Sequence, residues 1–182
     1  MEVLRLTVKK ACAEDMGKLE QLGLITRLLP PEDLTDIAEG DIRVQTMYST
    51  DLKYGGHKLV FVNTHLVQSR LSYHPDKEDV ILVNPGGQTK PLVWVFGLHR
   101  RQAFEERVRA GTLSDGDLVA LEIPFNDPSL SFFTVHENVP HYEVTVPGPG
   151  RSPSFWVTEP KDLPIVPIDL AGYRIELEMG RG

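Results

Sequence analysis

The spacing of hydrophobic positions changes after about the first 40 residues of the chain. Residues 14–29 carry apolar side chains at every third position, a spacing that favours a helix. These positions are Met16, Leu19, Leu22 and Ile25. From Asp41 onward, apolar residues recur at every second position, in short runs separated by turns that contain glycine and proline, which is typical of strands. The pattern predicts a helical or extended N-terminal segment followed by a β-rich region.

This β-rich region is predicted to contain about eight to ten short strands. They include residues 42–49, 58–67, 67–74, 79–83, 91–98, 118–125, 132–135, 140–146, 155–158 and 173–179. Residues 99–111 are the exception, because Phe104, Val108 and the closing Gly111 fit a short amphipathic helix. Helices do not alternate with strands, which disfavours a parallel α/β sheet. We expect an all-β protein with a few short helices, built as a sandwich or a barrel.

Length and composition narrow the class of protein. The 182 residues fit a single domain, 1–182, in which residues 1–40 or so form the helical or extended segment. The net charge of -7 argues against a nucleic-acid-binding protein, because phosphate neutralisation requires a basic surface. The one cysteine, Cys12, rules out an intramolecular disulfide framework. No apolar run approaches the ~20 residues of a membrane span, and the N-terminus lacks the order of a signal peptide, so a cytoplasmic protein is expected.

Two predicted strands each have a polar face that carries a histidine. In the strand near the end of the chain, His141, Glu143 and Thr145 share one face. In the earlier strand, the shared face consists of Gln68, Arg70, Ser72 and His74. In a simple sandwich these polar faces would point to water, whereas in a barrel with a ligand-binding mouth they would converge inside. The sequence pattern leaves both arrangements open.

The segments "YHPDKEDVILV" (73–83) and "VHENVPHYEV" (135–144) resemble the cupin superfamily, and within it the ureidoglycolate lyase (formerly hydrolase) family most of all. That family has a His-Pro pair before a strand, here His74-Pro75, and later a Tyr-His-x-Asn-Val-Trp-His segment, here residues 135–141. The resemblance covers roughly residues 70–146. Ser72 stands where cupins have the first metal-binding histidine, and Pro140 replaces an aromatic residue. The resemblance implies a cupin-like double-stranded β-helix barrel (a jelly roll), often a homodimer, with its site in the barrel mouth.

By this resemblance, His74, Asp79 and His141 are the candidate metal ligands. Two imidazoles and a carboxylate suit one divalent ion such as Zn, Mn, Ni or Fe, with a position left open for water or substrate, and Glu143 could complete the shell. Without a metal, the same histidines suit acid–base catalysis. Arg70 is the candidate to hold a substrate carboxylate through two hydrogen bonds, with Arg43 as a second candidate.

The remaining substrate-binding candidates are Ser72, His136 and Glu143. The resemblance implies cleavage of ureidoglycolate to glyoxylate and urea, in which His141 or His74 moves the proton and either a metal or Arg70 stabilises the oxyanion. One alternative is a metal-dependent cupin with another reaction, such as a sugar isomerase or a dioxygenase. Another is a cupin that binds a small molecule without converting it. The expected partners are a small-molecule substrate and a second copy of the chain, with no nucleic acid and no membrane.

Overall fold

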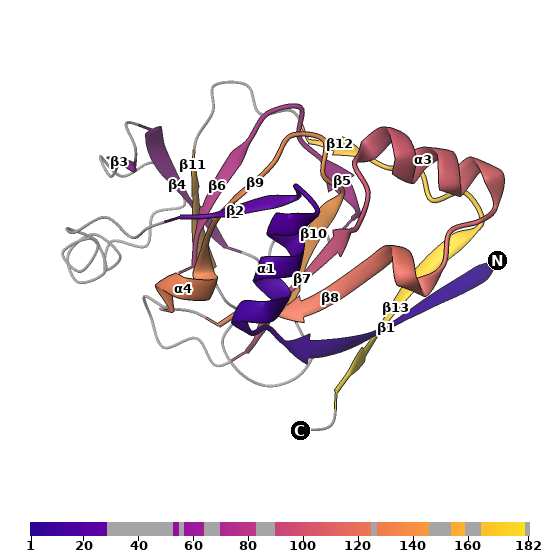
Figure 1. Cartoon of the computed structure of the whole chain (residues 1–182), viewed down its shortest axis with the longest axis horizontal. Helices are drawn as coiled ribbons and strands as arrows, with labels where there is room; N and C mark the ends of the chain where they lie inside the picture. The colour runs from indigo at the N-terminus through magenta and orange to yellow at the C-terminus, as the bar shows by residue number, and fades with distance from the viewer. Residues whose placement is uncertain are drawn as a thin grey trace.

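The protein is built mostly from strands with a few short helices, as the sequence pattern predicted (Figure 1). The computed structural model describes residues 1–28, 53–54, 57–63, 70–82, 90–124, 127–145, 154–158 and 165–180. The predicted strand at residues 42–49 lies outside these residues. None of the described helices is long and apolar enough to cross a lipid bilayer.

The described strands form two sheets. The seven-stranded sheet contains β1 (Glu2–Lys10), β5 (Ser72–Tyr73), β7 (Leu92–Gly97), β8 (Leu118–Glu122), β10 (His141–Thr145), β12 (Val166–Pro167) and β13 (Tyr173–Met179). The six-stranded sheet contains β2 (Ile25–Arg27), β3 (Lys53–Tyr54), β4 (His57–Asn63), β6 (Glu78–Ile81), β9 (Phe132–Val135) and β11 (Ser154–Thr158). The described helices are α1 (Ala13–Gln21), α3 (Arg101–Ala110), α4 (Pro128–Ser131) and the 3-10 turn η3 (Asp115–Asp117).

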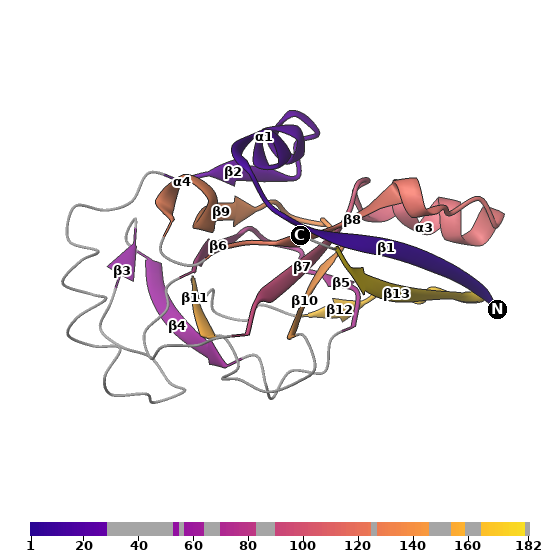
Figure 2. The ribbon, with the colours of Figure 1, turned by 90° about the horizontal axis from the view of Figure 1, so that it is seen from below.

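The chain passes repeatedly from one sheet to the other. The seven strands are ordered β12-β5-β10-β7-β8-β1-β13, and the six are ordered β2-β9-β6-β11-β4-β3. The pairs are antiparallel except at β1, which is parallel to both β8 and β13. The seven-stranded sheet is curled into a half-barrel, and α3 lies beside β8 and β1 in Figure 2. Side chains from strands that are distant in sequence can therefore come together in the space between the two sheets.

Both faces of β7, near the middle of the seven-stranded sheet, are buried. Its residues are all fully buried, with Trp94 and Phe96 in one hydrophobic core and Val93 and Val95 in the other. The first core is shared with β6, β9 and α1, and the second with α3 and β1. A strand that is buried on both faces reads as a continuous hydrophobic run instead of an alternating one, which explains the sequence of β7.

The N-terminal segment differs from the prediction. The predicted helix at residues 14–29 ends at Gln21, because Gly23 has a left-handed φ of 72° and the next residues pair as β2 with β9. Leu22, which has the helical spacing, is 54% exposed. The residues before the helix form β1, a strand that was not predicted from the sequence. The predicted helix at 99–111 is confirmed as α3, which ends at Gly111 with a φ of 69°.

Candidate metal centre

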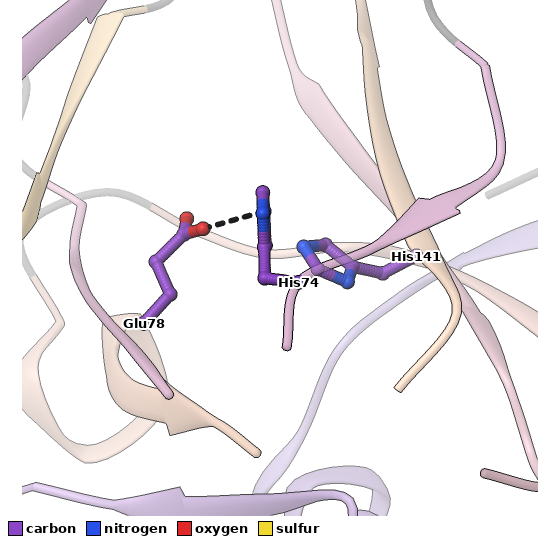
Figure 3. A group of neighbouring side chains, drawn as sticks. All are labelled: His74, Glu78 and His141. Carbon is purple, nitrogen blue, oxygen red and sulfur yellow. Dashed lines mark ion pairs between the residues drawn. The ribbon is translucent and has the colours of Figure 1, made fainter. Parts of the chain in front are cut away.

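Three buried side chains, His74, Glu78 and His141, point toward one another between the two sheets (Figure 3). His74 follows β5 and His141 opens β10, and these neighbouring strands pair at Ser72 and His141. Glu78 opens β6 in the other sheet. Their exposed fractions are 8%, 5% and 3% for His74, Glu78 and His141. The site is thus assembled from both sheets and lies away from solvent.

The local sequence fixes these residues at the ends of their strands. Asn138 has a left-handed φ of 62° in the turn between β9 and β10, a conformation that asparagine tolerates better than most residues. Its N–H donates to the carbonyl of His74 at 2.8 Å, so the turn before His141 is tied directly to the residue after β5. Buried Val139 anchors the same turn in the first core. One turn therefore positions both histidines.

The hydrogen bonds of the site define how each imidazole is presented. His74 Nε2 lies 2.8 Å from Glu78 Oε2. His141 Nδ1 lies 2.8 Å from the carbonyl of Val139, an acceptor only, so Nδ1 carries the hydrogen that is donated. In the neutral ring, this tautomer leaves the lone pair on Nε2. A backbone carbonyl that orients a histidine in this way is a common feature of metal ligands.

An aromatic wall holds the His141 ring in place. The ring stacks on Trp94 at 6.1 Å between centroids and on Phe96 at 6.3 Å, and its centroid is 5.2 Å from that of His74. Burial is the main cause that lowers the pKa of His141. The ring is therefore neutral at pH 7, which is the protonation state that binds a metal ion.

Glu143 adds a second carboxyl near this group. It lies two residues beyond His141 on the same face of β10, as the sequence pattern predicted. Burial, the largest cause, and the negative charge of Glu78 together raise the pKa of Glu143 to about 8, although His74 opposes the change. At pH 7 the carboxyl of Glu143 is mostly protonated, so it carries a proton beside the three potential ligands.

The group His74, Glu78 and His141 could hold a metal ion. Each side chain offers one ligand atom, and all these atoms lie within 4.8 Å of one another. Around an ion with bonds of about 2.0–2.2 Å, neighbouring ligand atoms are roughly 3–3.5 Å apart, so movements on the order of 1 Å would close the group. The ion would replace the direct contact between His74 Nε2 and Glu78 Oε2. Three protein ligands leave positions open for water or substrate.

The acidic ligand was not among the predicted ones. The cupin resemblance implies Asp79 at this place, whose backbone lies next to Glu78 in β6 but whose side chain is outside the described structure, so its role stays a prediction. A signal for Glu78 was present, because it shares the strand face of Val80 and Leu82, and both of these are in the first core. Counting in steps of two from those core positions would have selected Glu78.

The other predicted residues occupy different places. Ser72 is half-buried and pairs with His141 through its backbone. Arg70 is exposed and lines an open hollow of about 400 Å³ with residues 167–170. None of the three potential ligands is in the described lining of that hollow. Arg43 and Gln68 lie outside the described residues. The proposed role of Arg70 therefore stays a prediction.

His136 is bound to the N-terminal part of the chain and is not part of this group. Its Nε2 lies 2.6 Å from Thr26 Oγ1 of β2, and its backbone N–H donates to the carbonyl of Leu24. Burial and the positive charges of Lys77 and Arg100 lower the pKa of His136. These contacts connect β2 to the turn before β10, and the predicted substrate-binding role of His136 stays a prediction.

Comparison with known proteins identifies no relative of this chain. No protein family matches the chain, and neither a curated protein nor a solved structure matches it. The assignment of a function to this chain therefore depends on the geometry of its own residues.

Proposed function

We propose that the protein is a metal-dependent enzyme of the cupin type that acts on a small polar carboxylate. The observation that carries the proposal is the buried His74, Glu78 and His141 group. Two imidazoles and one carboxylate with open positions are the ligand set of many catalytic Zn, Mn and non-haem Fe sites. Imidazole and carboxylate ligands do not select the soft ions that thiolates select, and Cys12 lies exposed at the start of α1.

The connectivity of the strands supports a double-stranded β-helix. Within the two sheets, one set of four strands is ordered β4-β11-β6-β9 and the other β5-β10-β7-β8. Along the chain, the strands enter these two sets alternately, except at the β7–β8 pair. This order folds the chain back across two facing sheets, as in jelly rolls. The potential ligands lie between the sheets, where such folds place a small-molecule site.

The substrate we propose first is ureidoglycolate, which would be cleaved to glyoxylate and urea. In this reaction the C–N bond breaks, the substrate hydroxyl loses its proton, and the departing urea nitrogen gains one. Glu143 lies on the ligand face of β10 and interacts with Glu78 and His74, which places it to exchange this proton. A bound ion would supply Lewis-acid stabilisation of the oxyanion. The stacked rings of Trp94 and Phe96 exclude water from one side.

A metal-dependent cupin with another reaction, such as sugar isomerisation or oxygen insertion, is the second candidate, because the His/Glu/His set also suits those reactions. Protein loaded separately with Zn, Mn, Ni and Fe(II) would be assayed for glyoxylate release from ureidoglycolate, for ketose formation and for oxygen uptake. We expect turnover with at least one ion, and its loss in His141→Asn. Equal activity in wild type and His141→Asn would contradict the proposal.

The same assays also distinguish a wrong substrate from a wrong metal site. Metal binding without glyoxylate release, but with isomerisation or oxygen uptake, would select the second candidate. Metal-dependent binding of a carboxylate without conversion would instead indicate a binding protein. Glu105→Gln, which alters a carboxyl on α3 that pairs with Arg101, is the matched control and should leave all activities unchanged.

A further inference from the structure

Among the described strands, one edge of the two sheets is long and unpaired. The edge strands β12, β2 and β3 have two, three and two residues, and β12 contains Pro167, which cannot donate a ladder hydrogen bond. The fourth edge strand, β13, has seven residues and no proline. In Figures 1 and 2 it flanks β1 at the margin of the protein that is opposite β3. A long strand at an edge is a template on which another chain can pair.

The backbone hydrogen bonds show which groups of β13 face outward. The N–H of Glu2 donates to the carbonyl of Gly172, and the N–H of Gly180 donates to the carbonyl of Val8. Even-numbered residues of this strand therefore direct their backbone groups toward β1. The N–H and C=O groups of Ile175, Leu177 and Met179 alternate with them and point to the open edge. Among the described elements, no strand pairs with that edge.

The side chains of β13 divide into a charged and an apolar face. Arg174, Glu176 and Glu178 share the charged face, where Arg174 pairs with Glu176 and Arg5 of β1 pairs with both glutamates. On the other face, Ile175 and Leu177 pack against the second core but remain half-buried, and Met179 is 47% exposed. The apolar face of the strand is thus incompletely covered at the edge of the sheet.

We propose that a second copy of the chain pairs with β13 in the antiparallel direction, with the two-fold axis at Ile175. Hydrogen bonding requires odd-numbered residues to face odd-numbered ones, which leaves three central registers. An axis at Glu176 pairs Arg174 with Glu178 but places the Glu176 carboxylate opposite itself, and an axis at Leu177 places Glu176 opposite Glu178. Only the axis at Ile175 places Arg174 of each copy opposite Glu176 of the other copy, which gives two such pairs.

In this register, charge complementarity identifies a second copy as the occupant of the edge. Each Arg174 would lie between Glu176 of its own strand and Glu176 of the second copy, which gives four alternating charges across the joint. Ile175 would face Ile175 of the second copy, and Tyr173 would face Leu177, which extends the apolar face over the half-buried side chains. The inference is independent of the metal site, because β13 contributes nothing to that group.

Charge exchange tests this register directly. Sedimentation velocity over a concentration series would be run on wild type, Arg174→Glu, Glu176→Arg, the double variant with both exchanges, and an equimolar mixture of the two single variants. We expect a wild-type dimer, and about tenfold or greater weakening of the dimer in each single variant, since both cross-strand pairs become like-charged. The double variant and the mixture should restore the dimer, since both again place opposite charges face to face.

Control variants distinguish a weakened dimer interface from a loss of folding. Arg109→Glu makes the same charge change on an exposed position of α3 and should leave the dimer intact. Ile175→Pro removes an outward N–H without removing a bond to β1, and should weaken the dimer even if Glu176→Arg does not fold. A wild-type monomer at all concentrations would overturn the proposal. So would an unchanged dimer in Arg174→Glu, or a mixture that stays monomeric when both single variants are folded.

Discussion

Replacement of Glu78 by glutamine should abolish the stabilisation of the protein by a bound metal ion. Glutamine keeps the shape of the side chain but replaces the carboxylate that faces His74 Nε2 at 2.8 Å with a neutral amide. A ligand present at 100 times its dissociation constant stabilises a folded protein by about 2.7 kcal/mol. For a chain of this size, about 1 kcal/mol corresponds to roughly 2–4 °C in Tm, so the wild type should gain about 5–11 °C.

The variant should retain very little of this shift. Loss of a residue that merely supports a ligand weakens metal binding by about 10–100-fold. Loss of the ligand itself should weaken binding by at least about 100-fold. At the same metal concentration, a 100-fold weaker site would be half-occupied and would stabilise by about 0.4 kcal/mol, or roughly 1 °C in Tm.

Differential scanning calorimetry of chelator-treated protein, with and without Zn, Mn, Ni or Fe(II), measures these shifts. Each variant is compared with its own metal-free form, so that any change in its intrinsic stability cancels. Glu105→Gln on α3 is the control and should keep the full wild-type shift. A wild type that gains no stability with any of the four ions, or Glu78→Gln with an undiminished gain, would refute the assignment of Glu78 as a ligand.

Three further predictions concern the folded state without metal. Because the raised pKa of Glu143 makes the folded state hold a proton that the unfolded state has lost, the free energy of unfolding should fall as pH rises from about 4.5 to 8, and Glu143→Gln should flatten this slope in urea titrations; an identical slope would contradict it. Phe133→Ala should cost about 3–5 kcal/mol in the same assay, since its buried ring packs edge-on against Trp94 at 5.4 Å, and a cost below about 1 kcal/mol would argue against this core. Asp15→Ala should cost about 1 kcal/mol, because Asp15 accepts the N–H of Cys12 at the start of α1, whereas an unchanged urea midpoint would show that this cap is dispensable.

The β-rich fold followed from the sequence because its strands carry their own signals. The run at residues 91–98 and the helix at 99–111 were predicted close to their observed bounds. β1 was not predicted, although Leu4, Leu6 and Val8 alternate with polar residues and all three are buried. The helix at 14–29 was predicted too long because Leu22 and Ile25 happen to continue its spacing. Pairing of residues 25–27 with β9 overrides that local signal, and such long-range pairing is not encoded in a spacing.

The candidate site was predictable only in part. Period-two spacing placed polar faces on the two strands with His74 and His141, and the structure brings these rings to 5.2 Å. The sequence left open whether the faces point to water or to the interior, and in the structure both histidines are buried. The contribution of Glu78 depends on how the second sheet packs over the first. That packing is fixed by the two hydrophobic cores and not by any local pattern around residue 78.

The metal stoichiometry of the protein tests the central claim most directly. Wild type, Glu78→Gln and His141→Asn would be dialysed against each of Zn, Mn, Ni and Fe(II) and then against metal-free buffer, and the retained metal would be measured by inductively coupled plasma mass spectrometry. We expect close to one equivalent of at least one ion per wild-type chain, and little in either variant. Wild-type protein that retains none of these ions, or variants that retain as much as the wild type, would contradict a metal centre at His74, Glu78 and His141.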